Sequence, residues 1–145
     1  MTTSNAYLRF NGNCEAAFMH YKEVFGGEFQ HMGRFSEMPP LEGMPPIPEA
    51  DKNKVMHVTL PIGGETILMG SDTMAPYNAD FQTGNNFSIS IHTDTREEAE
   101  RIFNALSAKG KTVMPMNKTF WKSYFGMCVD QFGISWMVNM NLDEQ

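Results

Sequence analysis

Arg9 is the side chain in this 145-residue sequence with the clearest capacity to bind an anion. It alternates with Leu8 and Phe10 in the segment NAYLRF, so it lies opposite the apolar face of a predicted strand. A guanidinium matches carboxylate and phosphate groups, and an arginine at mid-strand on a cavity face is costly to bury without a partner. We therefore expect Arg9 either to bind an anionic ligand or to pair internally with Asp72 or Glu65.

Two histidines, His57 and His92, occupy the same kind of position on other predicted strands. Imidazoles exchange protons near neutral pH and ligate metal ions. A metal site would need a third donor, for which Asp72 or Glu65 could serve, although neither has a clearly matching position on that face. We favour plain hydrogen-bonded histidines here, and a metal site that uses both is the alternative. His20 and His31 are expected to be structural or exposed.

The other candidate groups are aromatic, hydroxyl and thioether side chains. Trp121 and Phe125 could stack on a ligand ring, although aromatic residues near a sheet more often belong to the core. The sequence has no G-x-S-x-G turn, no G-x-x-x-x-G-K loop and no glycine-rich strand–helix turn for a nucleotide. We predict a ligand-binding site without a known catalytic residue, cofactor or metal. Its expected members are Tyr7, Arg9, His57, Ser88, Ser90, His92, Trp121 and Met137.

Changes in hydrophobic period predict the elements that hold these residues. Strands are predicted at 5–10, 28–35, 55–63 and 64–72, and again at 87–94, 111–117, 119–130 and 134–140. Apolar stripes of helical spacing predict helices near 14–25 and 96–109. Asn13 is the expected cap of the first helix, and Thr95 with Glu98 has capping-box spacing at the second.

The two halves form an internal repeat within one domain, with a first module at about 4–72, a linker at 73–85 and a second module at 86–142. The helices superpose at an offset of 82 residues and the closing turns at 69, which places Leu68 on Met137. A proline-rich loop, 36–53, accounts for most of the difference and holds Met-Pro-Pro twice, at 38–40 and 44–46. It could close over a site, form a dimer contact or be a simple insertion.

The first strand of each half has one apolar face, suited to pack on its helix, and one mixed face. In the second half the apolar face is predicted to hold Phe87, Ile89 and Ile91. The mixed face is expected to line a largely apolar cavity with a few polar anchors. By alternation, the later strands contribute His57, Thr59, Thr66, Leu68, Ser135, Met137 and Asn139 to it.

Composition limits the possible partners. The net charge is −6, and no cluster of lysine and arginine favours nucleic acid or an anionic membrane. No apolar run approaches the ~20 residues of a membrane span, and the N-terminus lacks the pattern of a secretory signal. Cys14 and Cys128 are too few for a disulfide framework, so we expect reduced thiols in a cytoplasmic protein.

Three segments, AYLRFNGNCEAAFMHYKEVFGGE, VMHVTLPIGGETILMGSD and FWKSYFGMCVDQFGISWMVNM, together resemble the vicinal oxygen chelate superfamily. This superfamily contains glyoxalases, bleomycin-resistance proteins and extradiol dioxygenases, and the sequence is most similar to its PhnB-like branch. The resemblance implies an α+β fold in which two βαβββ modules form a curved eight-stranded sheet with two main helices. It also implies frequent dimerisation, so we expect a homodimer.

Metal-dependent relatives place one ligand on the first strand and one on the fourth strand of each module. The matching positions here are Asn5, Leu68, Ser88 and Met137. None supplies the carboxylate, imidazole or thiolate that a divalent ion needs, so the resemblance implies a lost metal site.

Three functions remain open at this stage. The first is a protein that binds a small anionic or aromatic molecule without a metal. The second is a lyase, isomerase or dioxygenase with a relocated site at His57 and His92. The third is an antibiotic-sequestering protein of the resistance type.

Overall fold

The structure, a computed structural model, describes residues 1–39 and 42–142, which form two compact units divided between Gln82 and Thr83. The first unit contains β1 (Ala6–Phe10), α1 (Cys14–Phe25), β2 (His31–Arg34), β3 (Val55–Gly63) and β4 (Thr66–Asp72). The second contains β5 (Ile89–Thr93), α2 (Arg96–Ser107), β6 (Lys111–Lys118), β7 (Ser123–Val129) and β8 (Ser135–Asn141). The predicted pair of βαβββ modules is confirmed. Among the described helices, none is long and apolar enough to cross a membrane.

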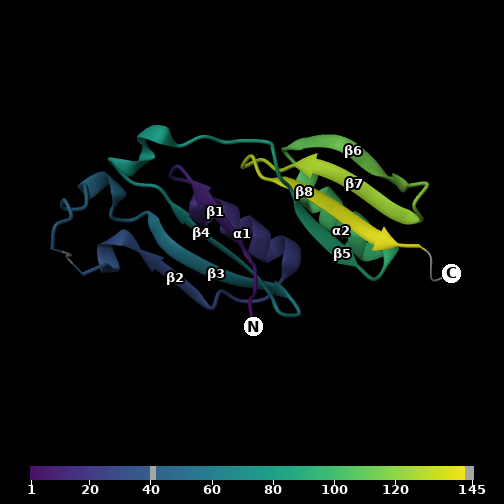
Figure 1. Ribbon diagram of the computed structural model, residues 1–145, viewed down its shortest axis with the longest axis horizontal. Coiled ribbons are helices and arrows are strands. Elements are labelled where there is room, and N and C mark those ends of the chain that lie inside the picture. Colours follow the sequence, from purple (N-terminus) through teal and green to yellow (C-terminus); the bar gives the residue numbers. More distant parts are fainter. Residues whose placement is uncertain (40–41, 143–145) are drawn as a thin grey trace. The chain divides into compact units, whose positions relative to one another are not determined.

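Each unit builds a four-stranded mixed sheet with one helix against one face (Figure 1). The order is β1-β4-β3-β2 in the first sheet, here called sheet A, and β5-β8-β7-β6 in the second, sheet B. In both, the first strand pairs in parallel with the fourth, and the other pairs are antiparallel. The face without the helix is called the open face below.

Close packing of α1 on sheet A decides which residues turn inward. Leu8 and Phe10 are buried beneath the helix, which confirms the predicted alternation of β1. A Cβ added to Gly70 would lie 2.6 Å from the Phe18 ring, so only glycine allows the helix this close to β4. Gly70 pairs with Leu8, which places alternate residues of β4 under α1 as well.

The predicted place of Leu68 on the cavity face is wrong. Leu68 is 1% exposed and pairs with Ala6, so it lies on the helix side, and Thr66 has the same parity. The residue equivalent to Met137 is Met69, because Met69 pairs with Tyr7 as Met137 pairs with Ser90. The pairing of β3 with β4 shifts in register between Pro61 and Gly63, beside the turn that joins the two strands. An alignment of the turn glycines in the two halves of the sequence does not reveal this shift.

The predicted cap of α1 is confirmed in position only, since Asn13 is the N-cap residue of the helix. Asn13 makes no side-chain capping hydrogen bond. The carboxylate of Asp72, at the end of β4, instead accepts hydrogen bonds from the backbone N–H groups of Gly12 and Cys14, both at 2.9 Å. Its second oxygen accepts from the N–H of Val55, also at 2.9 Å. Asp72 thus ties the start of α1 to two strands that are distant in sequence.

In the second unit, the turn between β7 and β8 is organised by the buried Asp130. Its Oδ1 accepts from the N–H groups of Phe132 at 2.8 Å and Ile134 at 3.0 Å, and its Oδ2 accepts from the indole N–H of Trp136 at 2.8 Å. Trp136 is fully buried under α2. This turn therefore serves the core, and Thr95 caps α2 by accepting from the N–H of Glu98 at 3.2 Å, as the capping-box spacing predicts.

The start of sheet B differs from the prediction. Phe87, expected on the apolar face, precedes β5 and is 63% exposed, and Ser88 also lies before the strand. Only Ile89 and Ile91 keep the predicted apolar parity within β5, and both are partly buried. The alternation of apolar and polar residues begins at Phe87 in the sequence, whereas the pairing of β5 with β8 begins at Ile89.

Both thiols should be unreactive in the folded protein. Burial, reinforced by the charge of Asp72, raises the pKa of Cys14, and burial with Asp130 raises the pKa of Cys128 to about 11. Thiolates are the reactive form, so a disulfide reagent at pH 8 should label neither cysteine until denaturant is added. Rapid labelling of the native protein would contradict this.

The same shifts set an alkaline limit on stability. Because the folded-state pKa values are raised, the stabilisation is fully present below the ordinary thiol pKa of 9.0 and is lost as the pH rises toward 11.

Candidate ligand-binding faces of the two sheets

The open face of sheet A gathers polar side chains from all four strands. Directly paired residues of neighbouring strands share a face. One row runs Tyr7, Met69, Thr59, His31, and the adjacent row begins with the pair Arg9 and Ser71. Val58 pairs with Gly70, so His57 lies beside Ser71 in that second row. The predicted Tyr7, Arg9 and His57 are therefore brought onto one surface.

A chain of hydrogen bonds crosses this face. The Tyr7 hydroxyl lies 3.2 Å from Nδ1 of His57, and Nε2 of His57 lies 2.9 Å from Oγ1 of Thr59. A neutral imidazole has one donor and one acceptor, so either Tyr7 donates and Thr59 accepts, or both roles reverse with the tautomer. The ring of Tyr7 reaches over β4 to do this, with its centroid 5.6 Å from that of His57. The chain fixes the orientation of His57 and leaves it only partly buried.

Arg9 stands on the same face without an internal counter-ion. Asp72, one of the two suggested partners, is 4% exposed on the helix side and binds three backbone N–H groups. Glu65 lies in the exposed turn before β4 and forms no ion pair with Arg9. Within residues 1–39 and 42–142, Arg9 has no carboxylate at salt-bridge distance. Its guanidinium is exposed and available to an external anion.

Sequence reasoning assigned His31 to a structural or exposed role and missed Met69 and Ser71. His31 is exposed, yet its ring centroid lies 5.9 Å from that of His57, so it belongs to the same surface. The pairing of β2 with β3 brings it there. Met69 and Ser71 were missed because the predicted register of β4 differs from the observed one by one residue, which exchanges the two faces of the strand. No carboxylate occupies an open-face position of the four strands, so the surface carries cationic and neutral groups only.

The open face of sheet B has a different chemistry. Ser90, Met137, Met127 and Met114 form one row across its four strands. His92, Asn139, Phe125 and Asn117 form the next. Trp121, in the turn before β7, packs edge-on against Phe125 with ring centroids 5.8 Å apart and is 52% exposed. Methionine and aromatic side chains dominate, whereas sheet A presents an arginine and two histidines.

The predicted site residues therefore fall into two groups. Tyr7, Arg9 and His57 belong to the first unit. Ser90, His92, Trp121 and Met137 belong to the second, and Ser88 precedes its first strand.

The positions matched to the family's metal ligands do not share a face. Leu68 lies under α1, and Asn5 precedes β1, where its Oδ1 accepts weakly from the N–H of Ile67 at 3.4 Å. The open-face positions in register are Tyr7 with Met69 and Ser90 with Met137. In the described part of the chain, no three histidine, cysteine, aspartate or glutamate side chains are grouped closely enough to hold a metal ion. The amide, alkyl, hydroxyl and thioether side chains at the four matched positions do not fit a divalent cation.

Comparison with known proteins agrees with the fold. A model of the family described as 3-demethylubiquinone-9 3-methyltransferase matches residues 3–139. Protein YjdN of Escherichia coli (strain K12) is 33% identical over 139 residues, which cover 92% of each chain. Protein PA1353 from Pseudomonas aeruginosa is 38% identical, with a TM-score of 0.84 over 97% of this chain and 98% of that one.

More distant structures share the architecture. The PhnB protein from Bacillus cereus superposes with a TM-score of 0.75 at 24% identity, over 96% of this chain and 99% of that chain. Other solved structures that superpose on the chain are described as glyoxalase/bleomycin resistance/dioxygenase proteins. With two βαβββ modules and a family match over nearly its whole length, the chain belongs to the PhnB-like branch of the vicinal oxygen chelate superfamily.

Proposed function

We propose that this protein binds a small anionic molecule on the open face of sheet A, with Arg9 as the charged anchor. The observation that carries the proposal is the exposed guanidinium of Arg9, which pairs with no carboxylate of residues 1–39 and 42–142 and lies beside the Tyr7–His57–Thr59 chain. An exposed arginine can bind a carboxylate or phosphonate through two parallel hydrogen bonds. The buried, protonated thiols suit the reducing cytoplasm, where we propose the protein acts.

The spacing of the strands limits the size of the ligand. Arg9 and His57 are separated by one strand, so their backbones lie about 10 Å apart at ordinary strand spacing. A small acid held by Arg9 could direct a second polar group toward Tyr7 or His57. The half-exposed ring of Tyr7 provides an apolar wall between them, which also suits a flat or aromatic acid.

We also propose that binding needs no metal at the family's usual positions. The amide of Asn5, the alkyl chain of Leu68, the hydroxyl of Ser88 and the thioether of Met137 are poor substitutes for the charged donors of a divalent site. The predicted alternative, a relocated metal site at His57 and His92, would need residues of both units. The closeness of His31 and His57 favours a two-histidine site at these two residues as the competing function instead. Both ring nitrogens of His57 already have hydrogen-bond partners, so a metal would have to displace Tyr7 or Thr59.

Methyl transfer, which the family description names, is not part of this proposal. A nucleotide-type methyl donor is usually held by a doubly wound sheet with a glycine-rich strand–helix turn. The described residues form two βαβββ modules, and the turn after β1 leads through Asn11, Gly12 and Asn13 to a helix start occupied by Asp72.

Titration of the purified protein tests the proposal. Small carboxylates and phosphonates should bind with measurable heat in metal-free buffer, and nickel, zinc and manganese should bind without defined stoichiometry. Elemental analysis of the protein as purified provides the matching control. One tightly bound metal per chain, lost on replacement of His57 by phenylalanine, would favour the relocated metal site instead.

We further propose a homodimer. The second unit exposes large apolar side chains that a soluble surface normally covers, including Phe120 at 94% and Trp121 at 52% exposure. Val113 and Met114 of β6, an edge strand, are also exposed. Sedimentation should show a dimer at micromolar concentration. The double variant Phe120→Ser, Trp121→Ser should dissociate into monomers more readily than the control variant Met19→Ser, which changes an exposed position of α1. A monomeric wild-type protein would contradict the proposal.

A further inference from the structure

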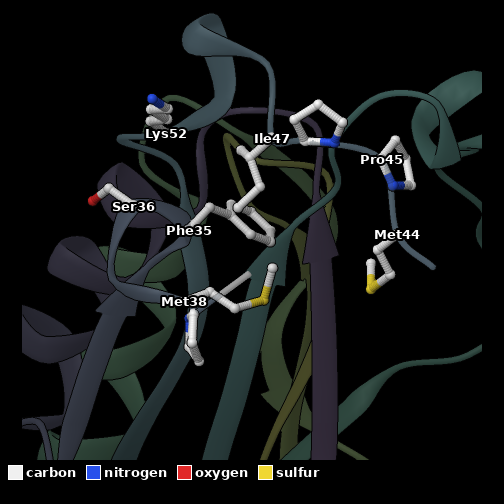
Figure 2. A pocket seen from close by; sticks show the side chains of 9 residues that line it. Phe35, Ser36, Met38, Met44, Pro45, Ile47 and Lys52 are labelled. Carbon is white, nitrogen blue, oxygen red and sulfur yellow. The ribbon is translucent and has the colours of Figure 1, made fainter. Parts of the chain in front are cut away.

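The proline-rich loop of the first unit encloses a pocket separate from the open face of sheet A. Its volume is about 280 Å³. Most of the wall is apolar, formed by Phe35, Met38, Pro39, Met44, Pro45 and Ile47. Figure 2 shows Phe35 in the centre, with Ile47 above it, Met38 below it, and Met44 and Pro45 to its right. The two Met-Pro segments come from the repeated Met-Pro-Pro motif at 38–40 and 44–46. Positions 40 and 41 lie outside the described residues.

The base of this loop is firmly built. Phe35 is buried, and its N–H donates to the carbonyl of Lys54 at 3.1 Å, while the N–H of Ser36 donates to the carbonyl of Lys52 at 2.9 Å. These bonds continue the pairing of β2 with β3 beyond the ends of the strands. The pocket floor is thus an extension of sheet A.

A buried carboxylate fastens the far end of the loop. Asp51 binds the ammonium of Lys54 at 2.7 Å and accepts from the N–H of Ala75 at 3.1 Å. The hydrogen bond from Lys54 lowers the pKa of Asp51. Arg34, just before Phe35, forms a two-pronged ion pair with Glu15 of α1 at 2.9 and 3.0 Å. The loop is therefore held at both ends, and Phe35 at its base is anchored to the sheet.

The pocket's chemistry favours an uncharged ring. Proline rings and thioethers contact aromatic faces and edges well, and methionine sulfur adds a specific attraction. The polar groups in the lining are the Ser36 hydroxyl and Lys52, whose ammonium is already paired with Glu49 at 2.9 Å. A cavity of about 150 Å³ can hold benzene, so this pocket has room for two fused rings. It is smaller than the ~300 Å³ at which drug-sized sites begin.

We propose that this pocket binds a neutral aromatic molecule of one or two rings, independently of the anion site at Arg9. The exposed walls lose contact with water when the ring enters, and the anchored floor of Phe35 provides a flat surface beneath it. The Ser36 hydroxyl can exchange a hydrogen bond with one polar group at the ring edge. Nothing in the lining compensates a full charge, because Lys52 has its own counter-ion.

Indole is a suitable probe, followed by methyl NMR of the full-length protein labelled at its methionine methyl groups. The Met38 and Met44 signals, assigned by single replacements with leucine, should shift together with indole concentration. Indole-3-acetate and tryptamine should bind more weakly than indole. The proposal is overturned if these two signals stay unchanged, or if either charged analogue binds more tightly.

Variants locate the site. Ile47→Asp places a charge in the wall and should raise the dissociation constant of indole by about tenfold or more. Met19→Asp adds the same charge at an exposed position of α1 and should leave the dissociation constant of indole unchanged. Arg9→Ala should also leave it unchanged. Equal affinities of Ile47→Asp and wild type would overturn the pocket assignment. Loss of indole binding in Arg9→Ala would overturn its independence from the anion site.

Discussion

Replacing Arg9 by alanine is expected to weaken the binding of small carboxylates and phosphonates by about ten- to a hundredfold. The estimate follows from the ~1.5–3 kcal/mol of hydrogen bonds to charged groups, where each 1.4 kcal/mol is a factor of ten. Arg9 has no internal carboxylate among the described residues, so its removal leaves no buried partner unpaired. The loss should therefore appear in affinity, with little change in stability. Calorimetric titration at low ionic strength measures it.

Two further variants separate geometry from charge. Arg9→Lys keeps the positive charge and loses the planar fork, so it should recover only part of the affinity. Lys111→Ala removes the same charge from exposed β6 of the second unit and should change affinity little. If Lys111→Ala weakens binding as much as Arg9→Ala, the effect is one of net charge, and the proposed anchor is wrong.

Replacing Asp72 by alanine is expected to lower the free energy of unfolding by about 4 kcal/mol. Two buried N–H groups, of Cys14 and Val55, and the part-buried N–H of Gly12 lose their acceptor together, and each unmade bond costs ~1–3 kcal/mol when it is buried. The carboxylate also lies at the N-terminus of α1, where the helix dipole favours negative charge. Asp72→Asn should recover part of the loss, because its amide offers one oxygen where the carboxylate offers two.

Urea unfolding followed by circular dichroism measures this change. Asp80→Ala, at an exposed position of the same unit, is the matched control and should stay within about 0.5 kcal/mol of wild type. A similar small effect for Asp72→Ala would show that water or backbone rearrangement satisfies the three donors. The open face of sheet A should keep its anion binding in Asp72→Asn wherever the protein remains folded, since Asp72 lies on the opposite side of the sheet.

Local pattern determined most of the architecture of this protein. A stripe of apolar residues at helical spacing specifies α1 at Cys14–Phe25, as predicted, and strict alternation places Leu8 and Phe10 inward and Arg9 outward. These features depend on residues a few positions apart, whose side chains point in directions that backbone geometry fixes. Arg9, Tyr7 and His57 could therefore be assigned to one kind of face before the sheet was known.

The tertiary structure alone decided register and pairing. Whether Leu68 or Met69 lies on the open face of sheet A depends on the turn at Gly63, because a shift of one residue moves a whole strand to the other face. Whether Asn13 or Asp72 caps α1 depends on β4 ending beside the helix start, 58 residues from Cys14. In the same way, the pairing of β2 with β3 brings His31 to His57. Such contacts join segments distant in sequence, and their geometry is set by packing and long-range hydrogen bonds, which no local periodicity encodes.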